Sequence, residues 1–353
     1  MLDYLIIGQG IAGSLLSYEL LKNNHNNILV IDKENPKASS MVGTGICNPI
    51  VGKYLKKTWM VDDFFSQLVE TYQDLEKILA TNFLRKIPIY HKYNDIEEQN
   101  RIMGFSANAE WQDYINTSPD NTQYQLFVES KLGGWESKNS FQVNGSRFLL
   151  AWRKYLIEKQ KYKSLNFNEN KLVFHQQYIE YKHIKAKKVI FCRGFEDATS
   201  NFFKSLPFSL VKGEWLKIKI KDVPQLESII IQSCFLLPLE NQEYIVGSTY
   251  HWDNLTEDIS INAKEELVEK LERFLKVPYQ IIEQKVGIRP ATHTRKPFLG
   301  KHFTHQNLFI FNGLGTKGFS LAPFFAKQMA KYLISDDINA IQNEARVKYK
   351  TKI

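Results

Sequence analysis

The chain has 353 residues, of which 43% are hydrophobic and 13% aromatic, and it carries a formal net charge of +8. This composition argues against a disordered chain, and the lack of any apolar run of about eighteen residues argues against a membrane span. The positive charge fits either an anionic partner or a lysine-rich solvated surface, so by itself it identifies no partner.

The N-terminal residues predict a buried strand and a turn rather than a secretion signal. The apolar opening lacks a basic leader, contains Asp3, and is interrupted by three glycines within residues 8–13. The three cysteines are odd in number and far apart, and the histidines show no metal-ligand spacing, so we expect neither a disulfide framework nor a metal site. We therefore expect a protein of the reducing cytoplasm.

The first elements predict a β-α-β unit. An apolar run at residues 4–7 precedes the glycine-rich turn, residues 12–21 carry apolar side chains at helical spacing, and a second apolar run at 28–31 ends at Asp32. Such units place parallel strands in a sheet that helices cover.

Later segments predict further strands of this sheet and a second sheet. The apolar runs 189–192 and 308–311 each end close to a glycine, as expected where strand ends face a ligand. Other segments have strand-like composition and predict a mainly antiparallel sheet: 88–90, 127–129, 215–220, 229–237 and 244–248.

We therefore expect a mixed α/β fold in which an antiparallel β-sheet domain is inserted into a Rossmann-like, dinucleotide-binding domain with a parallel sheet. The predicted cofactor-binding domain comprises residues 1–85, 145–205 and 285–353. The predicted substrate-binding domain comprises residues 86–144 and 206–284.

The glycine-rich turn has the spacing of a dinucleotide fingerprint. Gly8 permits the tight turn, Gly10 lets the backbone approach a pyrophosphate, and Gly13 lets the helix pack against the sheet. Asp32 follows about twenty residues later, at a strand end where its carboxylate can accept hydrogen bonds from a ribose. From this region we expect cofactor contacts from Gly8, Gln9, Gly10, Ile11, Ala12, Gly13, Asp32 and Lys33.

Two later motifs carry a family resemblance. One is Gly287-Ile288-Arg289-Pro290, and the other is the glycine-rich segment 312–323, which leads into a helix reaching about residue 333. Together with the N-terminal fingerprint they resemble the D-amino acid oxidase and glycine oxidase superfamily of FAD-dependent oxidoreductases. The resemblance covers both ends of the chain and is loose in the middle third.

The resemblance implies non-covalently bound FAD. In such folds the late glycine-rich loop passes under the isoalloxazine ring, and the following helix points its N-terminus at the N1–C2=O edge, where reduction places negative charge. Lys317 either adds positive charge there or is a solvated loop lysine. The loop residues expected at the cofactor are Gly313, Gly315, Thr316, Lys317, Gly318 and Phe319.

The resemblance also implies a substrate anchor. Arg289 would bind a substrate carboxylate through two parallel N–H donors, a geometry that lysine does not reproduce. The alternative is an internal ion pair that joins the two domains. Tyr250 either hangs over the flavin from the substrate domain or packs in a core.

A small-residue segment after the second strand resembles the family's ribityl-binding and flavin-binding stretch, although an ordinary turn is the competing interpretation. Here we expect contacts from Ser39, Ser40, Gly45 and Ile46. Cys192-Arg193-Gly194 departs from the small residues that relatives have at this place, which leaves Gly194 as the expected contact.

From this resemblance we expect an oxidoreductase that oxidises a C–N bond of a small amine or amino acid, with Arg289, Tyr250 and Lys317 at the reaction site. A hydride passes to flavin N5 and the imine hydrolyses. Reoxidation by oxygen is typical of the family, and a dehydrogenase that uses another electron acceptor is the alternative. Two alternatives stay open. One is an oxidase domain acting on a carboxymethylamino-modified tRNA uridine, and the other is a flavin-binding module without turnover.

Overall fold

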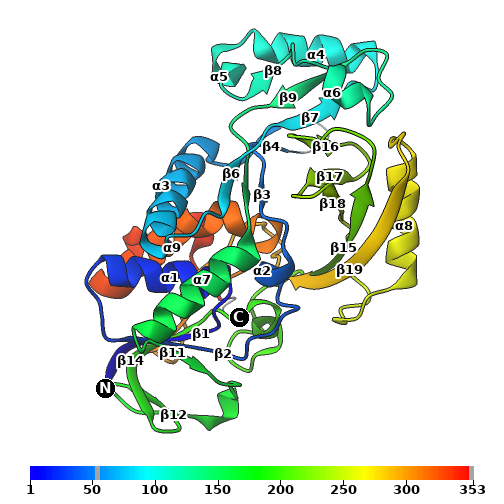
Figure 1. The fold of residues 1–353 in the computed structure, drawn as a ribbon. Helices are drawn as coiled ribbons and strands as arrows, with labels where there is room; N and C mark the ends of the chain where they lie inside the picture. The colour runs from blue at the N-terminus through cyan, green and yellow to red at the C-terminus, as the bar shows by residue number, and fades with distance from the viewer. Residues whose placement is uncertain (52–55, 350–353) are drawn as a thin grey trace.

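The computed structural model describes residues 1–51 and 56–349, which form two main sheets with helices packed around them (Figure 1). The centre of the first sheet is parallel, in the order β11-β2-β1-β14-β21. Antiparallel β13 and β12 extend it beside β14, and β20 pairs with β21. Its strands are β1 (Leu2–Ile7), β2 (Ile28–Asp32), β11 (Tyr162–Ser164), β12 (Leu172–Phe174), β13 (Ile179–Tyr181), β14 (Ile184–Phe191), β20 (Phe298–Lys301) and β21 (Leu308–Asn312).

Alternation along β1 explains how this sheet is buried on both faces. Tyr4 and Ile6 belong to a core shared with four helices, whereas Leu5 and Ile7 belong to a core on the opposite face. The four helices are α1 (Ile11–Lys22), α3 (Val61–Leu79), α7 (Gly145–Glu158) and α9 (Gly318–Ser335). Continuous apolar strands are what a parallel sheet covered on both faces requires.

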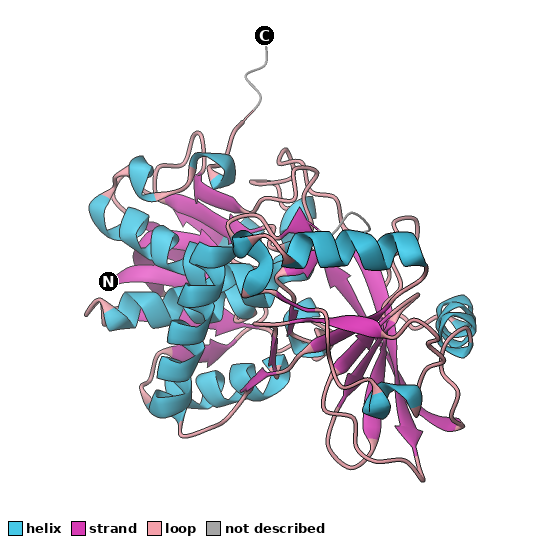
Figure 2. Ribbon diagram, turned by 90° about the horizontal axis from the view of Figure 1, so that it is seen from above, coloured by secondary structure: helices cyan, strands magenta, loops and turns pink. Residues whose placement is uncertain are grey.

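The second sheet has the order β19-β15-β18-β17-β16-β7-β9-β8, and its pairs are antiparallel except for β16 with β7. In both ribbon views it lies apart from the first sheet (Figures 1 and 2). The strands are β7 (Ile89–Lys92), β8 (Ile115–Asn116), β9 (Gly134–Ser137), β15 (Val211–Ile220), β16 (Ile229–Ile231), β17 (Phe235–Pro238), β18 (Glu243–Gly247) and β19 (Tyr279–Arg289). The predicted mixed α/β fold, with one parallel and one mainly antiparallel sheet, is confirmed.

Smaller elements lie between the strands of the two sheets and after the last of them. The short strands are β3 (Ile46–Cys47), β4 (Ile50–Val51), β5 (Lys56–Lys57), β6 (Leu84–Lys86) and β10 (Phe141–Val143). The remaining α-helices are α2 (Ser39–Val42), α4 (Ile96–Ser106), α5 (Ala109–Gln112), α6 (Thr122–Gln125) and α8 (Ile261–Glu272). The 3-10 turns are η1 (Glu169–Lys171), η2 (Gly194–Thr199), η3 (Gly315–Lys317), η4 (Ile338–Ala340) and η5 (Asn343–Ala345).

One predicted strand was wrong. Residues 127–129 follow α6, and the N–H groups of Phe127 and Val128 both donate to the carbonyl of Tyr124, so the backbone turns there instead of extending. A single bridge joins Val128 to Leu275. The apolar side chains that suggested a strand are buried in the core of the second sheet.

The strands that form the two sheets alternate along the chain. The first sheet takes its strands from residues 2–32, 162–191 and 298–312, and β19 runs from the second sheet to Arg289. The domain boundaries given above stay a prediction. Within residues 1–51 and 56–349, no helix combines the length and apolar character needed to cross a bilayer.

Candidate active site

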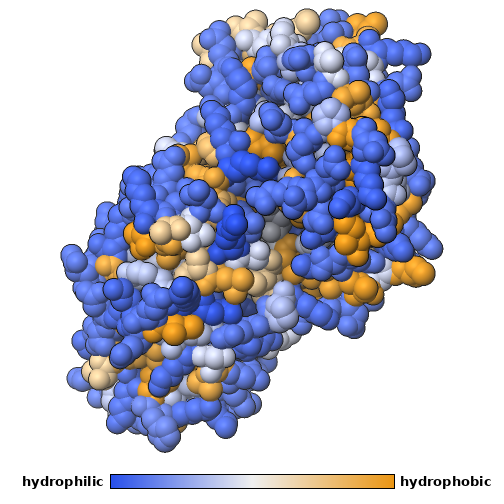
Figure 3. Space-filling view, viewed as in Figure 1, coloured by the Kyte–Doolittle hydropathy of each residue, from blue (hydrophilic) through white to orange (hydrophobic). Residues whose placement is uncertain are grey.

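One pocket collects residues from both sheets and has a cavity volume of about 360 Å³. In the space-filling view, apolar residues reach the surface between the two lobes, as they also do at several other places on a mostly hydrophilic face (Figure 3). Of the residues predicted from sequence, the pocket is lined by Gly8, Gln9, Gly10, Ile11, Ala12, Asp32, Lys33, Ser39, Ser40, Gly45, Ile46, Gly194, Tyr250, Arg289, Gly315, Thr316, Lys317, Gly318 and Phe319. Gly13 and Gly313 lie behind the lining.

The glycine-rich turn brings the N-terminus of α1 to the pocket. Gly8 has a φ of +102°, and a Cβ there would lie 2.4 Å from the carbonyl oxygen of Cys192. A Cβ on Gly13 would lie 1.9 Å from the carbonyl oxygen of Gly8, so Gly13 lets α1 approach the strand without touching the pocket. Gly10 caps the helix without a side chain. The positive end of the helix therefore faces a cradle of bare backbone, which fits a pyrophosphate.

Asp32 is held at the end of β2. Its carboxylate accepts hydrogen bonds from the N–H of Gln9 at 2.7 Å and the N–H of Glu34 at 2.5 Å. Gln9 lines the pocket, but its side chain is 2% exposed and donates to the carbonyl of Leu149. Lys33 forms an ion pair with Glu196. The backbone of the turn and the carboxylate thus form one rigid end of the pocket.

The segment after β2 fits closely under the pocket. The hydroxyl of Ser40 accepts a hydrogen bond from the N–H of Ile11 at 3.0 Å, which ties α2 to the start of α1. Gly45 has a φ of +70°, and a Cβ there would lie 1.8 Å from the carbonyl oxygen of Val143. The small residues are therefore needed for close backbone packing beside the pocket.

Arg289 lies at the other end, where the second sheet reaches the pocket. Its Nη2 donates to the Ser248 hydroxyl at 2.8 Å, its Nη1 donates to the carbonyl of Thr249 at 3.2 Å, and its guanidinium lies 4.6 Å from the Tyr250 ring centre. Burial lowers the pKa of Arg289. None of the described carboxylates lies within ion-pair distance of Arg289, so the alternative of an internal ion pair is not what the described structure shows.

Two facing glycines make room at this end. Gly213 on β15 is paired with Gly287 on β19. A Cβ on Gly213 would lie 2.1 Å from Nη2 of Arg289, and a Cβ on Gly287 would lie 2.5 Å from Cγ2 of Val42. The indole N–H of Trp215 donates to the carbonyl of Val42 at 2.7 Å. The second sheet therefore packs directly on α2, and the Arg289 guanidinium lies against the backbone of Gly213 on this sheet.

The late loop joins the two ends. The N–H of Gly315 donates to the carbonyl of Pro290 at 3.1 Å, which links this loop to the strand that carries Arg289. Lys317 donates to the hydroxyl of Thr58 at 3.4 Å. Burial and the nearby Arg295 lower the pKa of Lys317. The Phe319 ring packs in the core, and its carbonyl accepts a hydrogen bond from Tyr72.

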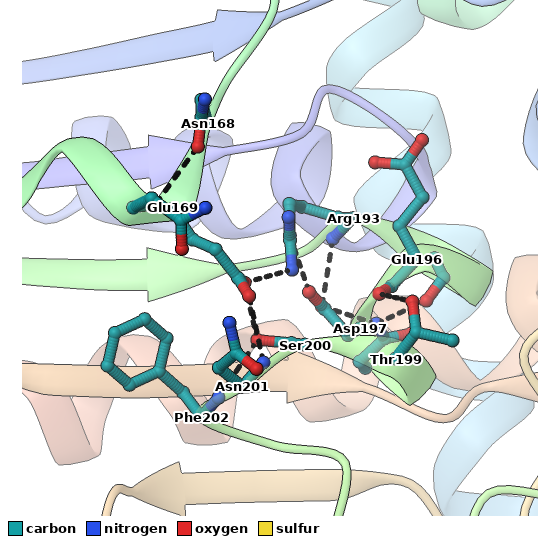
Figure 4. Close-up of polar contacts among 12 residues, drawn as sticks. Asn168, Glu169, Arg193, Glu196, Asp197, Thr199, Ser200, Asn201 and Phe202 are labelled. Carbon is teal, nitrogen blue, oxygen red and sulfur yellow. Dashed lines mark hydrogen bonds and ion pairs between the residues drawn. The ribbon is translucent and has the colours of Figure 1, made fainter.

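Arg193, where the sequence departs from the family, has an internal role (Figure 4). Its Nε donates to Asp197 at 2.7 Å and its Nη2 donates to Glu169 at 3.0 Å. Asn312 also donates to Asp197, at 2.7 Å, which connects the ends of β14 and β21. Burial raises the pKa of Asp197, although Arg193 opposes this shift. A Cβ on Gly194 would meet nothing within 4 Å, so its backbone stays open to the pocket.

Sequence reasoning missed several residues of the site: Arg153, Gly213, Ser248 and Phe235 all line the pocket. Ser248 and Gly213 follow no recognisable motif. Phe235 looks like any core phenylalanine, and Arg153 comes from a helix distant in sequence. No local signal could have identified them.

A pocket with a glycine-rich helix N-terminus at one end and a partly buried arginine at the other fits a dinucleotide cofactor together with an anionic ligand. The sequence matches the family described as FAD dependent oxidoreductase (DAO) over residues 3–332, and the chain belongs to this family. FAD is its cofactor, and the chain is an oxidoreductase.

Three comparisons place the chain among known proteins. The glycine oxidase of Bacillus subtilis (strain 168) is 24% identical over 144 residues, which cover 39% of each chain. The bifunctional tRNA 5-methylaminomethyl-2-thiouridine biosynthesis protein MnmC of Leptospira interrogans (serovar copenhageni strain) is 22% identical over 93% of this chain and 57% of its own length. The crystal structure of iminodiacetate oxidase from Chelativorans sp. BNC1 is 18% identical with a TM-score of 0.77, covering 95% of this chain and 96% of that one.

The matching stretch spans less than half of the first curated relatives, 39% of the Bacillus subtilis glycine oxidase and 29% of an MnmC protein from Vibrio vulnificus (strain CMCP6). The likeness to iminodiacetate oxidase shows the fold alone. The substrate of this chain is therefore argued from its own residues.

Proposed function

We propose that the chain oxidises the C–N bond of a small amine or amino acid whose carboxylate Arg289 binds. The observation that carries this proposal is a partly buried guanidinium in the same pocket as the cofactor-binding segments, with no acidic partner among the described residues. A buried cation without a counter-charge is costly, so the site favours an anionic ligand. The relative named glycine oxidase supports the same class of substrate.

When bound, FAD would supply the acceptor for a hydride from the carbon beside the substrate nitrogen, and the oxidised product would hydrolyse in water. Arg289 fixes the substrate carboxylate, while Ser248 and the carbonyl of Thr249 hold the guanidinium in place. Trp215 and Phe235 line the pocket and exclude water from the reacting carbon.

The chain positions the substrate, and no side-chain base is assigned to remove a proton from the amine. Among the described lining residues there is no histidine, Glu196 is paired with Lys33, and Asp32 is bound by backbone N–H groups. An amine that arrives neutral needs no side-chain base, because its own lone pair assists departure of the hydride. Lys317 lines the same pocket at the late loop, where its positive charge would stabilise negative charge on a bound cofactor.

The first experiment is a visible absorption spectrum of the purified protein, followed by a panel of amines and amino acids with peroxide detection. We expect a flavin spectrum that bleaches under anaerobic conditions with at least one carboxylate-bearing amine. A protein that holds flavin but is reduced by none of them would favour a binding module without turnover.

Replacement of Arg289 tests the anchor. We expect Arg289→Lys to raise KM for the active substrate about 10-fold or more, because lysine cannot donate two parallel hydrogen bonds to a carboxylate. Unchanged KM and kcat would remove Arg289 as the carboxylate anchor.

A second candidate is oxidation of a carboxymethylamino group on a tRNA uridine. It is favoured by the match to an MnmC protein over 93% of this chain. It also fits three neighbouring cations, Arg295, Lys296 and Lys317, which have no carboxylate within ion-pair distance among the described residues. Burial lowers the pKa of Lys296 and of Lys317, and a neighbouring cation adds to each shift, Lys317 at Lys296 and Arg295 at Lys317. Binding of tRNA that weakens steeply with salt would support this candidate, and indifference to tRNA would remove it.

A further inference from the structure

We propose that Arg153, on α7, is a positioning residue for the adenosine end of FAD. It holds the Asp32 carboxylate and the glycine-rich turn in the geometry that receives the ribose and the pyrophosphate. Arg153 lines the pocket, and its side chain is 13% exposed. This inference rests on FAD binding and is independent of which amine is oxidised.

The first contact is with the glycine-rich turn. Nε of Arg153 donates to the side-chain oxygen of Gln9 at 2.8 Å. The side-chain nitrogen of Gln9 donates to the carbonyl of Leu149 and to the hydroxyl of Ser14, each at 3.0 Å. Gln9 stands between the first two glycines of the turn. Its side-chain amide, bonded to Arg153, Leu149 and Ser14, therefore links the turn to α7. The main chain of Gln9 then donates to Asp32.

The second contact is with the acidic end of β2. Nη2 of Arg153 lies 3.8 Å from Oδ1 of Asp32, and Nη1 lies 3.4 Å from Oε2 of Glu34. The guanidinium also lies 5.6 Å from the ring centre of Tyr162, whose hydroxyl donates to Glu34 at 2.9 Å. Arg153 therefore lies between two carboxylates that would otherwise repel each other at the end of one strand.

The shape of the guanidinium suits this role. A planar group with donors on several sides can contact the turn and both carboxylates at once, whereas a lysine ammonium is a point charge on a flexible stem. With Arg153 in place, Asp32 enters binding already oriented and linked to the turn. Without Arg153, Asp32 and the turn would become ordered only when FAD binds, and this ordering would reduce the affinity for FAD.

The test compares FAD affinity in matched variants. Arg153→Met removes the charge and keeps the stem, Arg153→Lys keeps the charge and loses the fork, and Lys154→Met is the control. Lys154 is the next residue on α7, has an 81% exposed side chain, and pairs with Glu158 at 4.0 Å. The Kd of the apoprotein for FAD is measured by quenching of flavin fluorescence, and the Kd for ADP is measured by calorimetry.

We expect Arg153→Met to raise the Kd for FAD about 10- to 100-fold, the range for losing a hydrogen bond to a charged group. Arg153→Lys should give a smaller rise, and Lys154→Met should give none. Since Arg153 acts at the adenosine end, the Kd for ADP should rise by the same factor. At saturating FAD, the substrate KM should be unchanged.

Two results would overturn the proposal. One is an unchanged Kd for FAD in Arg153→Met. The other is a weakened Kd for FAD with an unchanged Kd for ADP, which would show that Arg153 does not act at the adenosine end. If Arg153→Met does not fold, Arg153→Lys decides by the same two measurements, with its circular dichroism spectrum as the check of folding.

Discussion

Gly213 shows how a missing side chain shapes the substrate end of the pocket. A Cβ there would lie 2.1 Å from Nη2 of Arg289, so alanine would push the guanidinium away from Ser248 and out of its plane. We expect Gly213→Ala to raise KM for a carboxylate-bearing substrate about 10- to 100-fold, the cost of misplacing a charged hydrogen bond. Steady-state kinetics at saturating FAD measures this effect.

A matched glycine provides the control. Gly104 lies in α4, where an added Cβ would meet nothing within 4 Å. We expect Gly104→Ala to leave KM unchanged. Equal KM values for wild type and Gly213→Ala would contradict the proposal that Gly213 makes room for the Arg289 guanidinium.

The pocket also shows which residues sequence can identify. Gly8, Asp32 and Arg289 stand in motifs whose spacing carries a mechanism, so they could be predicted without the fold. Ser248 and Arg153 could not, because their partners lie 41 and 144 residues away along the chain. Gln9 was expected at the cofactor from its position in the motif. In the structure its main-chain N–H donates to Asp32, and its side chain donates to Leu149 on α7.

At the scale of elements, the pairing of β7 with β9 buries a histidine without a hydrogen-bond partner. The ring of His91 stacks on Trp135 at 4.2 Å, and Nε2 of His91 has no partner among the described residues. Burial lowers the pKa of His91 to about 4 from its ordinary value of 6.5. The folded chain therefore keeps this ring neutral where the unfolded chain protonates it.

This difference predicts a pH dependence of stability. The contribution of a neutral His91 is complete above about pH 6.5 and is lost as the pH falls towards about 4, at a cost of about 3 kcal/mol. His91→Phe keeps the stack and removes the titrating group. Urea unfolding of the apoprotein across this range should show a shallower loss of stability for the variant. Identical slopes for the two proteins would refute this assignment.

Elements with a strong local pattern were predictable. The turn and helix after β1 follow from glycine spacing and apolar periodicity, and β2, β14 and β21 follow from short apolar runs. The mistaken strand at 127–129 shows the limit of this approach, because apolar content alone does not distinguish a strand from a buried turn. The order of strands within each sheet depends on contacts between distant segments, which local patterns do not specify.

At the scale of the whole molecule, the pocket lies between the two sheets and takes residues from both. Trp215 and Gly287 bring the second sheet onto α2, and Asn35 donates to Glu257 at 2.7 Å across the same junction. A ligand that fills this pocket binds the folded chain and not the unfolded one.

FAD removal should therefore lower stability by a calculable amount. At a free FAD concentration of 100 times Kd, the holoprotein should be more stable than the apoprotein by about 2.7 kcal/mol. Calorimetric unfolding at several FAD concentrations measures this difference as a rising Tm. A Tm that does not change with FAD would show that the cofactor does not bind the native pocket.

The pocket also has a consequence for biosynthesis. Residues 8–12 leave the ribosome early, but Gly315 to Phe319, which line the same pocket, leave it some three hundred residues later. A nascent chain that has already formed its first β-α-β unit still lacks the other wall of the cleft. Capture of the flavin must therefore wait until translation has passed the late loop, and until then the half-built cleft stays open to solvent and to chaperones.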